Sequence, residues 1–151
     1  MKKLILYIIL LFIVNSAFTQ QWVSFGDDTL WISISSGNPI VEEFYNEDTV
    51  LFVGGGFVYG GSTPLYNIGK WDNSTWYSQG NGIGSSGYVY SIQSYKNDLY
   101  IGGLFTDAGG VANTNNIARW NGTSWEALPY SYGGIGFTNT VRDLAVYNDT
   151  L

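Results

Sequence analysis

Carboxylates are the main candidates for acid–base chemistry in this chain of 151 residues, which has 12 acidic side chains but no histidine and no cysteine. The lack of cysteine excludes disulfides, thiol nucleophiles and thiolate zinc sites, and the lack of histidine removes the commonest general base and metal ligand. Glu42 and Glu43 are adjacent, so on a strand they point to opposite faces. The sequence therefore predicts no catalytic residue, no metal site and no bound cofactor. A glycosidase pair assembled from distant loops stays open as an alternative.

One glycine pattern has the spacing of a nucleotide-binding loop. Gly82-Ile-Gly-Ser-Ser-Gly87 matches G-x-G-x-x-G. A dinucleotide site needs this run to follow a strand and to open a helix, whose N-terminus binds the pyrophosphate. Here the run precedes Tyr88-Val-Tyr-Ser-Ile-Gln-Ser-Tyr95, which has the pattern of a strand. We therefore predict an interstrand loop and no bound nucleotide.

Aromatic side chains are the remaining candidates for ligand contact, with 6 Trp, 12 Tyr and 8 Phe. Four tryptophans recur at fixed repeat positions, which indicates packing between repeats more than a sugar-binding surface. They are Trp71, Trp76, Trp120 and Trp125. Five tyrosines fall outside the repeated pattern and are candidates for carbohydrate binding, with packing at the rim as the alternative. They are Tyr59, Tyr66, Tyr88, Tyr130 and Tyr132.

Three N-x-[ST] sequons are also present, beginning at Asn73, Asn121 and Asn148. Such sequons accept N-linked glycans in some secreted proteins. Asn73 and Asn121 occupy the same turn of successive repeats. Repetition of the turn explains them more simply than glycosylation does.

The first twenty residues have the three-part layout of a secretory signal peptide. A basic start, Met1-Lys2-Lys3, precedes the apolar run Leu4–Val14 and a short polar stretch. Those 11 apolar residues give roughly 16 Å of helix, shorter than the ~30 Å hydrocarbon core of a bilayer. We predict a signal peptide over residues 1–19, cleavage after Thr19, and no membrane span after cleavage.

The charge that remains is acidic. Removal of Lys2 and Lys3 takes the formal net charge from −6 to −8. A chain without a basic patch does not attract nucleic acid or anionic lipid, so nucleic acid is not an expected partner. The sequence predicts a secreted or cell-surface protein.

The rest of the chain repeats itself with a period near 50 residues. Gly54-Gly55 matches Gly102-Gly103 at a spacing of 48, and Trp71 and Trp76 match Trp120 and Trp125 at a spacing of 49. A further copy begins at residue 141 and matches the segment from residue 89 at a spacing of 52. A period of this length is typical of β-propellers and related arrays.

Each period divides into four short strands, and no apolar period of a helix follows the predicted cleavage site. Alternating or short apolar runs bounded by Gly pairs, Asx residues or Asn-Gly predict strands. The predicted strands are Val50–Gly54, Ile68–Trp71, Val89–Tyr95, Leu99–Gly103, Ile117–Trp120 and Trp125–Leu128. The glycine pairs are expected to permit close approach of neighbouring backbones.

An apolar strand that ends in Gly-Gly and is followed by two tryptophans resembles the kelch-type repeat. The two copies are Leu51-Phe-Val-Gly-Gly55 with Trp71 and Trp76, and Leu99-Tyr-Ile-Gly-Gly103 with Trp120 and Trp125. Kelch repeats each form one four-stranded blade of a β-propeller, as in the central domain of galactose oxidase. The sequence of the repeat is also similar to repeats in large secreted bacterial surface proteins, which often end in a type IX sorting domain. The copper chemistry of galactose oxidase does not transfer, because it relies on Cys and His.

The resemblance implies an all-β fold, a partial β-propeller of about two blades plus the start of a third. The propeller segment is expected over residues 20–151, with blade copies at about 40–79 and 88–128 and a partial copy at 141–151. The strand-like run Trp22-Val-Ser-Phe25 is expected to close the last blade of a full ring. The chain is then expected to be an N-terminal fragment whose further C-terminal blades are missing partners.

The expected function is that of a non-catalytic interaction or display module with an unknown protein or glycan ligand. A carbohydrate-binding propeller is the alternative, and a non-catalytic part of a secreted polysaccharide-acting enzyme is a third possibility.

Overall fold

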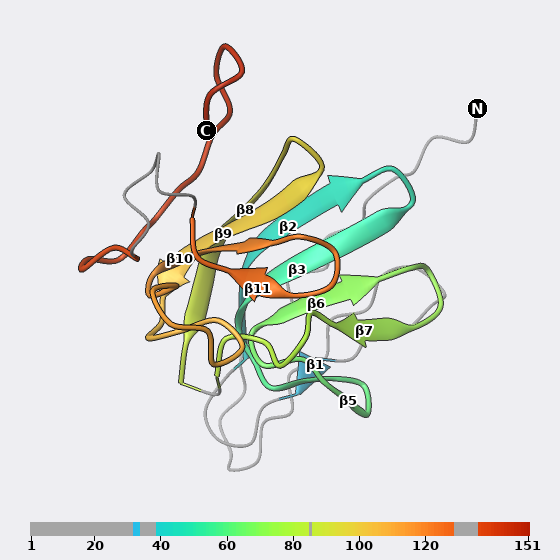
Figure 1. Cartoon of the computed structure of the whole chain (residues 1–151). Coiled ribbons are helices and arrows are strands. Elements are labelled where there is room, and N and C mark those ends of the chain that lie inside the picture. The colour runs from blue at the N-terminus through green and yellow to red at the C-terminus, as the bar shows by residue number, and fades with distance from the viewer. Residues whose placement is uncertain (1–31, 34–38, 85, 129–135) are drawn as a thin grey trace.

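The computed structural model describes residues 32–33, 39–84, 86–128 and 136–151. In these residues the chain is all-β, with eleven strands arranged in three antiparallel sheets (Figure 1). This part of the chain contains no helix long and apolar enough to cross a membrane. The predicted signal peptide, the strand-like run Trp22–Phe25, Tyr130 and Tyr132 lie outside the described residues.

Two four-stranded sheets have the same connectivity, each a meander in which sequential strands pair. In the first sheet the strands are β2 (Ile40–Glu47), β3 (Val50–Gly56), β6 (Ile68–Trp71) and β7 (Trp76–Ser78). In the second sheet they are β8 (Tyr88–Tyr95), β9 (Asp98–Leu104), β10 (Ile117–Trp120) and β11 (Trp125–Glu126). One period of the sequence repeat therefore corresponds to one four-stranded sheet.

The six predicted strands are confirmed, with differences at their ends. β3 continues to Gly56, β8 begins at Tyr88 and β9 covers Asp98–Leu104, so these three are longer than predicted. The prediction extended the last strand of the second sheet to Leu128, whereas β11 ends at Glu126. Leu128 leaves the ladder and packs, 5% exposed, in a cluster with Tyr95, Tyr100 and Ile117.

A third, small sheet lies where the sequence predicts no strand. It contains β1 (Ile32–Ser33), β4 (Tyr59–Gly60) and β5 (Thr63–Pro64) in the order β1-β4-β5. Strands of two residues carry no alternating pattern, so their pairing is fixed by the surrounding chain and not by local sequence. In the second repeat the same loop has only an isolated bridge between Ala108 and Val111.

The hairpins at one end of the sheets use two-residue turns with left-handed backbone. Lys96 and Asn97 between β8 and β9 have φ of 52° and 67°, and Asn148 and Asp149 in the third copy have φ of 47° and 55°. Positive φ at both central residues is the type I′ geometry that matches the twist of the flanking strands. Asn and Asp adopt it at less steric cost than other side chains.

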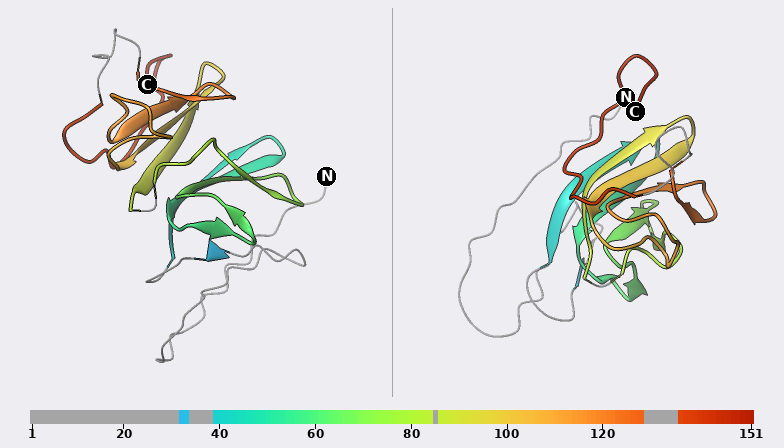
Figure 2. Two further views of the ribbon diagram at one scale, coloured as in Figure 1. Left: turned by 60° about the horizontal axis from the view of Figure 1, so that its bottom comes forward. Right: turned by 60° about the vertical axis from the view of Figure 1, so that its left-hand side comes forward.

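The two four-stranded sheets pack face to face, and their shared core contains residues of both (Figure 2). Phe52 and Ile68 of the first sheet lie in one cluster with Val89, Ile101 and other apolar side chains of the second. Full burial of an aliphatic side chain of this size contributes about 1.5–3 kcal/mol. The interface between the repeats is thus the main hydrophobic core of the described chain.

The glycine pairs allow this close packing, as predicted. A Cβ built on Gly54 would lie 2.6 Å from Cγ1 of Val89, and one built on Gly102 would lie 2.5 Å from Cγ1 of Val141. Val89 and Val141 occupy equivalent positions of successive repeats. The third copy therefore packs on the second sheet in the manner in which β8 packs on the first.

Residues 141–146 nevertheless form no strand in the structure. They are held by a hydrogen bond from the Val141 N–H to the Gly103 carbonyl and by one from the Leu144 N–H to the hydroxyl oxygen of Ser91. The following turn is formed, since Tyr147 and Thr150 exchange two backbone hydrogen bonds of 2.8 and 3.0 Å. The partial copy thus has the position and the turn of a first strand, without the ladder that a partner strand would supply.

Candidate functional site

The four repeated tryptophans form two matching pairs. In the first sheet the rings of Trp71 and Trp76 lie 5.3 Å apart and are tilted by 56°, and in the second those of Trp120 and Trp125 lie 5.1 Å apart and are tilted by 58°. Tilted ring pairs at this distance are favourable aromatic contacts. Trp76 and Trp125 are buried, and Trp71 and Trp120 are half-buried. The prediction that the tryptophans serve packing is confirmed for the two buried rings.

Trp125 also connects the two sheets. Its indole Nε1 donates a hydrogen bond of 2.8 Å to the carbonyl of Gln79, the residue that follows β7. Gly80, with φ of 57°, lies against Trp120, because a Cβ there would stand 3.0 Å from Cζ3 of that ring. The two residues that follow the first sheet therefore contact both tryptophans of the second sheet.

An open cleft of about 450 Å³ lies beside this contact, between the two four-stranded sheets. Both repeats contribute aromatic, amide and charged side chains to it. Its lining includes Lys70, Asp72, Tyr77, Asn97, Asp98 and Trp120. Tyr77 is 47% exposed, so its ring is accessible from the cleft. We take this cleft as the candidate binding site.

The polar groups of the cleft are held in place by their neighbours. The Asp72 carboxylate accepts backbone hydrogen bonds from Ser74 and Thr75 at 3.1 and 2.9 Å in the turn before β7. A hydrogen bond from the Ser74 hydroxyl, together with these backbone N–H groups, lowers the pKa of Asp72 to about 2. This carboxylate is therefore an anion at any pH near neutral.

Asp98 is held by Arg119, whose Nη1 lies 3.2 Å from the Asp98 carboxylate and whose Nη2 pairs with Glu126. The hydrogen bond between Arg119 and Glu126 raises the pKa of the guanidinium and lowers that of the Glu126 carboxylate. This ion-pair group spans the three strands β9, β10 and β11. It fixes one wall of the cleft.

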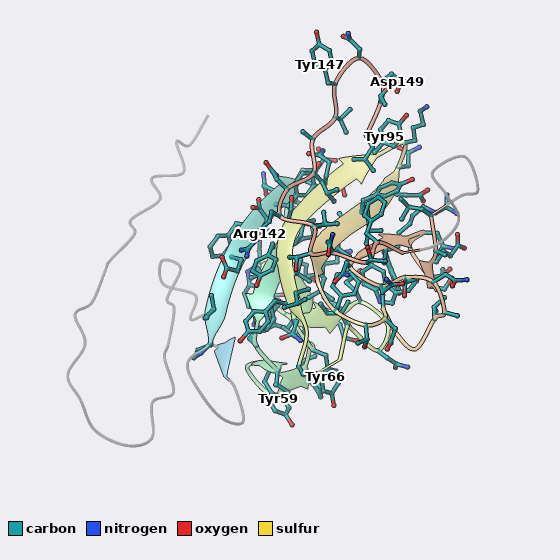
Figure 3. All side chains as sticks on the ribbon, turned by 90° about the vertical axis from the view of Figure 1, so that its left-hand side faces the viewer. Tyr59, Tyr66, Tyr95, Arg142, Tyr147 and Asp149 are labelled. Atoms are coloured by element: carbon teal, nitrogen blue, oxygen red, sulfur yellow. The ribbon has the colours of Figure 1, made fainter. Side chains whose placement is uncertain are left out.

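The tyrosines singled out in the sequence do not gather at this cleft. Tyr59, Tyr66 and Tyr88 are half-buried. Figure 3 shows Tyr59 and Tyr66 at the end of the molecule opposite to Tyr95. Tyr88 instead stacks on Tyr90, with ring centroids 6.1 Å apart and planes within 10° of parallel. None of these three tyrosines lines the cleft between the sheets.

The acidic pair near the start of β2 has two different environments. Glu42 is exposed and Glu43 is half-buried, in line with the predicted opposite faces. A β-bulge between Val41 and Glu43 and its counterpart between Val89 and Ser91 place Glu43 and Ser91 at equivalent positions. Burial, and then the charge of Asp143, raise the pKa of Glu43. Among the described residues, no three acidic side chains gather in a way that would hold a metal ion.

The glycine run from Gly82 to Gly87 precedes strand β8, as the sequence predicts. It lines a second, smaller cleft of about 370 Å³ with Phe105 and Asn116. The helix that a dinucleotide site requires is not found in the described part of the chain.

The sequon that begins at Asn121 has a structural role in its turn. The Asn121 side-chain oxygen accepts hydrogen bonds of 2.9 Å from the backbone N–H groups of Thr123 and Ser124.

Asn67 and Asn116 stand 49 residues apart at matching positions of the two repeats and have a structural role that the sequence patterns above did not reveal. Asn67 is 1% exposed with φ of 74°, and its side-chain oxygen accepts a hydrogen bond of 2.7 Å from the Phe57 N–H while its Nδ2 donates to the Gly84 carbonyl. Asn116 repeats both contacts, with the Phe105 N–H and the Phe137 carbonyl. An asparagine conserved between the two copies beside Ile68 and Ile117 was the available signal.

Comparison with protein-family profiles, with curated proteins and with solved structures finds no match to this chain.

Proposed function

We propose that this chain is a non-catalytic segment of a kelch-type β-propeller that serves as an interaction or display module. Stacking of the repeats is the observation that carries the proposal. Two sheets of the same connectivity pack face to face, and the third copy sits on Gly102 as β8 sits on Gly54. Each repeat offers an apolar face to the next one, as blades do.

We infer export to the cell surface or medium through the signal peptide predicted over residues 1–19. The basic start and short apolar run support this part of the proposal. In its most specific form, the proposal is that this chain is part of a large bacterial surface protein that carries a type IX sorting domain. Further blades would be the first partners of such a segment.

Carbohydrate binding is the second candidate function, and the cleft between the sheets favours it. An accessible aromatic ring binds the apolar face of a sugar, while carboxylates and amides accept and donate hydrogen bonds to its hydroxyl groups. Tyr77 and Trp120 supply the rings, and Asp72, Asp98 and Asn97 supply the polar groups. The carboxylates of the cleft repel an anionic polymer, so we propose a neutral glycan as the ligand class.

A glycan array of neutral and uronic-acid-containing oligosaccharides tests this candidate directly. We expect binding of neutral glycans, and a loss of about tenfold in affinity in Tyr77→Ala, equal to about 1.4 kcal/mol. Tyr59→Ala is the matched control, since Tyr59 lies at the end of the molecule opposite to Tyr95 and is absent from the cleft lining. Equal affinities of the two variants would remove the cleft as the binding site.

Incubation with polysaccharides tests the non-catalytic part of the proposal. We expect no release of reducing ends under conditions in which a glycan is bound. Turnover would overturn it and would favour a glycosidase pair assembled from distant carboxylates.

A further inference from the structure

The contact between the two four-stranded sheets differs from the contact between the second sheet and the third copy at corresponding positions. Tyr95 ends β8, is 7% exposed and donates a hydrogen bond of 2.6 Å from its hydroxyl to the carbonyl of Asp149 in the turn of the third copy (Figure 3). Its counterpart 48 residues earlier is Glu47, which ends β2 and is exposed. Glu47 lines the cleft together with Asn97, the counterpart of Asp149. The position that a tyrosine closes at one interface is therefore left open by a glutamate at the other.

The residue that follows the last strand of each sheet shows a second difference. Leu128 is 5% exposed and packs with Tyr95 in an apolar cluster. Its counterpart 49 residues earlier, Gln79, is also 5% exposed but lines the cleft. The backbone carbonyl of Gln79 accepts hydrogen bonds from Trp125 Nε1 and from the Gly82 N–H, whereas its side-chain amide makes none to another described residue. Because buried amides nearly always have a partner, Gln79 indicates a polar occupant of the cleft.

The wall of the cleft formed by β6 and β7 differs in the same way from its counterpart in the second sheet. Arg119 and Glu126 lie opposite each other in the second sheet and form an ion pair. Their counterparts 49 residues earlier, Lys70 and Tyr77, also lie opposite each other, and both line the cleft. Where the second sheet has a closed ion pair, the first sheet therefore has an accessible ring beside an ammonium group.

We propose that Glu47 and Gln79 are binding residues of this cleft and that they hydrogen-bond the hydroxyl groups of a sugar ring stacked on Tyr77. This inference rests on the carbohydrate-binding function proposed above and assigns two residues to it. A carboxylate accepts hydrogen bonds and an amide both accepts and donates them, which matches hydroxyl groups that do both. Glutamate and glutamine also replace the tyrosine and leucine that pack the next interface. Departures from good packing of this kind are typical of functional sites.

Titration calorimetry of the full chain tests the assignment, with cellohexaose, mannohexaose and xylohexaose as neutral probes. Glu47→Tyr and Gln79→Leu each introduce the residue found at the next interface. We expect each variant to reduce the affinity for a probe that the parent binds by at least about tenfold. Glu42→Tyr is the matched control, because it adds the same ring at an exposed position of β2 that does not line the cleft. It should keep the affinity of the parent.

Thermal unfolding of the same variants supplies a measurement that needs no ligand. In Glu47→Tyr the new hydroxyl should bond the Asn97 carbonyl as that of Tyr95 bonds Asp149. Gln79→Leu should bury an apolar side chain as Leu128 does. We expect each to raise the melting temperature by about 2–4 °C, so that lost affinity cannot be ascribed to unfolding. A lower melting temperature in both variants would show that the cleft is not the open counterpart of the packed interface.

The two proposals fail in different ways. If the parent binds a probe and both variants keep its affinity, the assignment of Glu47 and Gln79 is wrong while carbohydrate binding stands. Retention of affinity by one variant alone removes that residue from the site. If the parent binds none of the probes, carbohydrate binding itself is wrong, and the occupant of the cleft is water.

Discussion

The indole Nε1 of Trp125 and the backbone carbonyl of Gln79 are joined by a buried hydrogen bond of 2.8 Å that crosses from the second sheet to the first. The two residues are 46 positions apart, nearly one repeat. The bond lies beside the hydrophobic core that the sheets share. Trp125 therefore contributes both a buried ring and a hydrogen bond to the interface between the repeats.

Removal of this bond should destabilise the stacked sheets. Trp125→Phe keeps an aromatic ring but leaves the Gln79 carbonyl without its donor, at a cost of about 1–3 kcal/mol. Trp125→Ala removes the buried ring as well and should cost about 3–5 kcal/mol. Urea unfolding followed by circular dichroism measures both values. Equal midpoints of Trp125→Phe and the parent chain would show that the bond contributes nothing.

Trp120→Ala should also lower stability, by less than Trp125→Ala. Trp120 is half-buried, so truncation removes less buried surface and leaves a gap against Gly80. We expect a loss of about 1–3 kcal/mol in thermal unfolding. A variant that keeps the melting temperature of the parent and loses only a ligand would contradict a packing role for this ring.

Gly54→Ala should destabilise the contact between the sheets through overpacking. The added methyl would stand 2.6 Å from Cγ1 of Val89 and 3.0 Å from Cδ1 of Ile92, which forces the sheets apart. Such strain typically costs 1–3 kcal/mol. The double variant Gly54→Ala with Val89→Ala should recover part of the loss, since it removes the opposing methyl groups. Additive effects in this double-mutant cycle would exclude a direct clash.

The ladder strands were predictable from the sequence because their signals are local. The Gly-Gly pairs, the paired tryptophans and the Asn-Gly turn recur at a fixed spacing, and each has a backbone or packing reason to do so. The roles of Trp76 and Trp125 as core residues followed from the same repetition. These signals predicted six of the eight strands in the two four-stranded sheets, and β2 and β7 were not among the six.

The candidate cleft could not be predicted, because it exists only between two sheets. Tyr77 and Trp120 are separated by 43 positions and approach one cleft through the stacking of the repeats. The short strands β4 and β5 and the bulge before Glu43 likewise depend on neighbouring chain and not on local pattern. Tyr59, Tyr66 and Tyr88, which fall outside the repeat, do not line this cleft and so did not point to it.

Asn67 should be essential for the connection between the first and second sheets. Asn67→Ala leaves the buried Phe57 N–H and Gly84 carbonyl without partners and places a methyl side chain at φ of 74°. Asn67→Gly relieves the backbone strain but still loses both hydrogen bonds, so it should be the milder of the two. We expect losses of about 2–4 kcal/mol for Ala and about 1–3 kcal/mol for Gly. Calorimetry of both variants, with the same pair at Asn116, separates the backbone effect from the side-chain effect.

Ionisation of Glu43 should weaken the fold as the pH rises. Burial and the negative charge of Asp143 raise the pKa of Glu43 above its ordinary value of 4.5, so the folded chain holds this proton more tightly than the unfolded chain does. Stability from the protonated form is then present below about pH 4.5 and is lost as the pH rises through the folded-state pKa.

Glu43→Gln should accordingly raise the melting temperature at pH 7 by about 1–3 °C and leave it unchanged near pH 3.5. Asp143→Asn should give part of the same gain, because it removes the second cause of the shift while the amide oxygen still accepts the bond from Ser91. Glu42→Gln replaces a carboxylate at the exposed neighbouring position and is the matched control. An equal gain in melting temperature for Glu43→Gln at both pH values would show that the packing of the Glu43 side chain, and not its charge, destabilises the fold at this bulge.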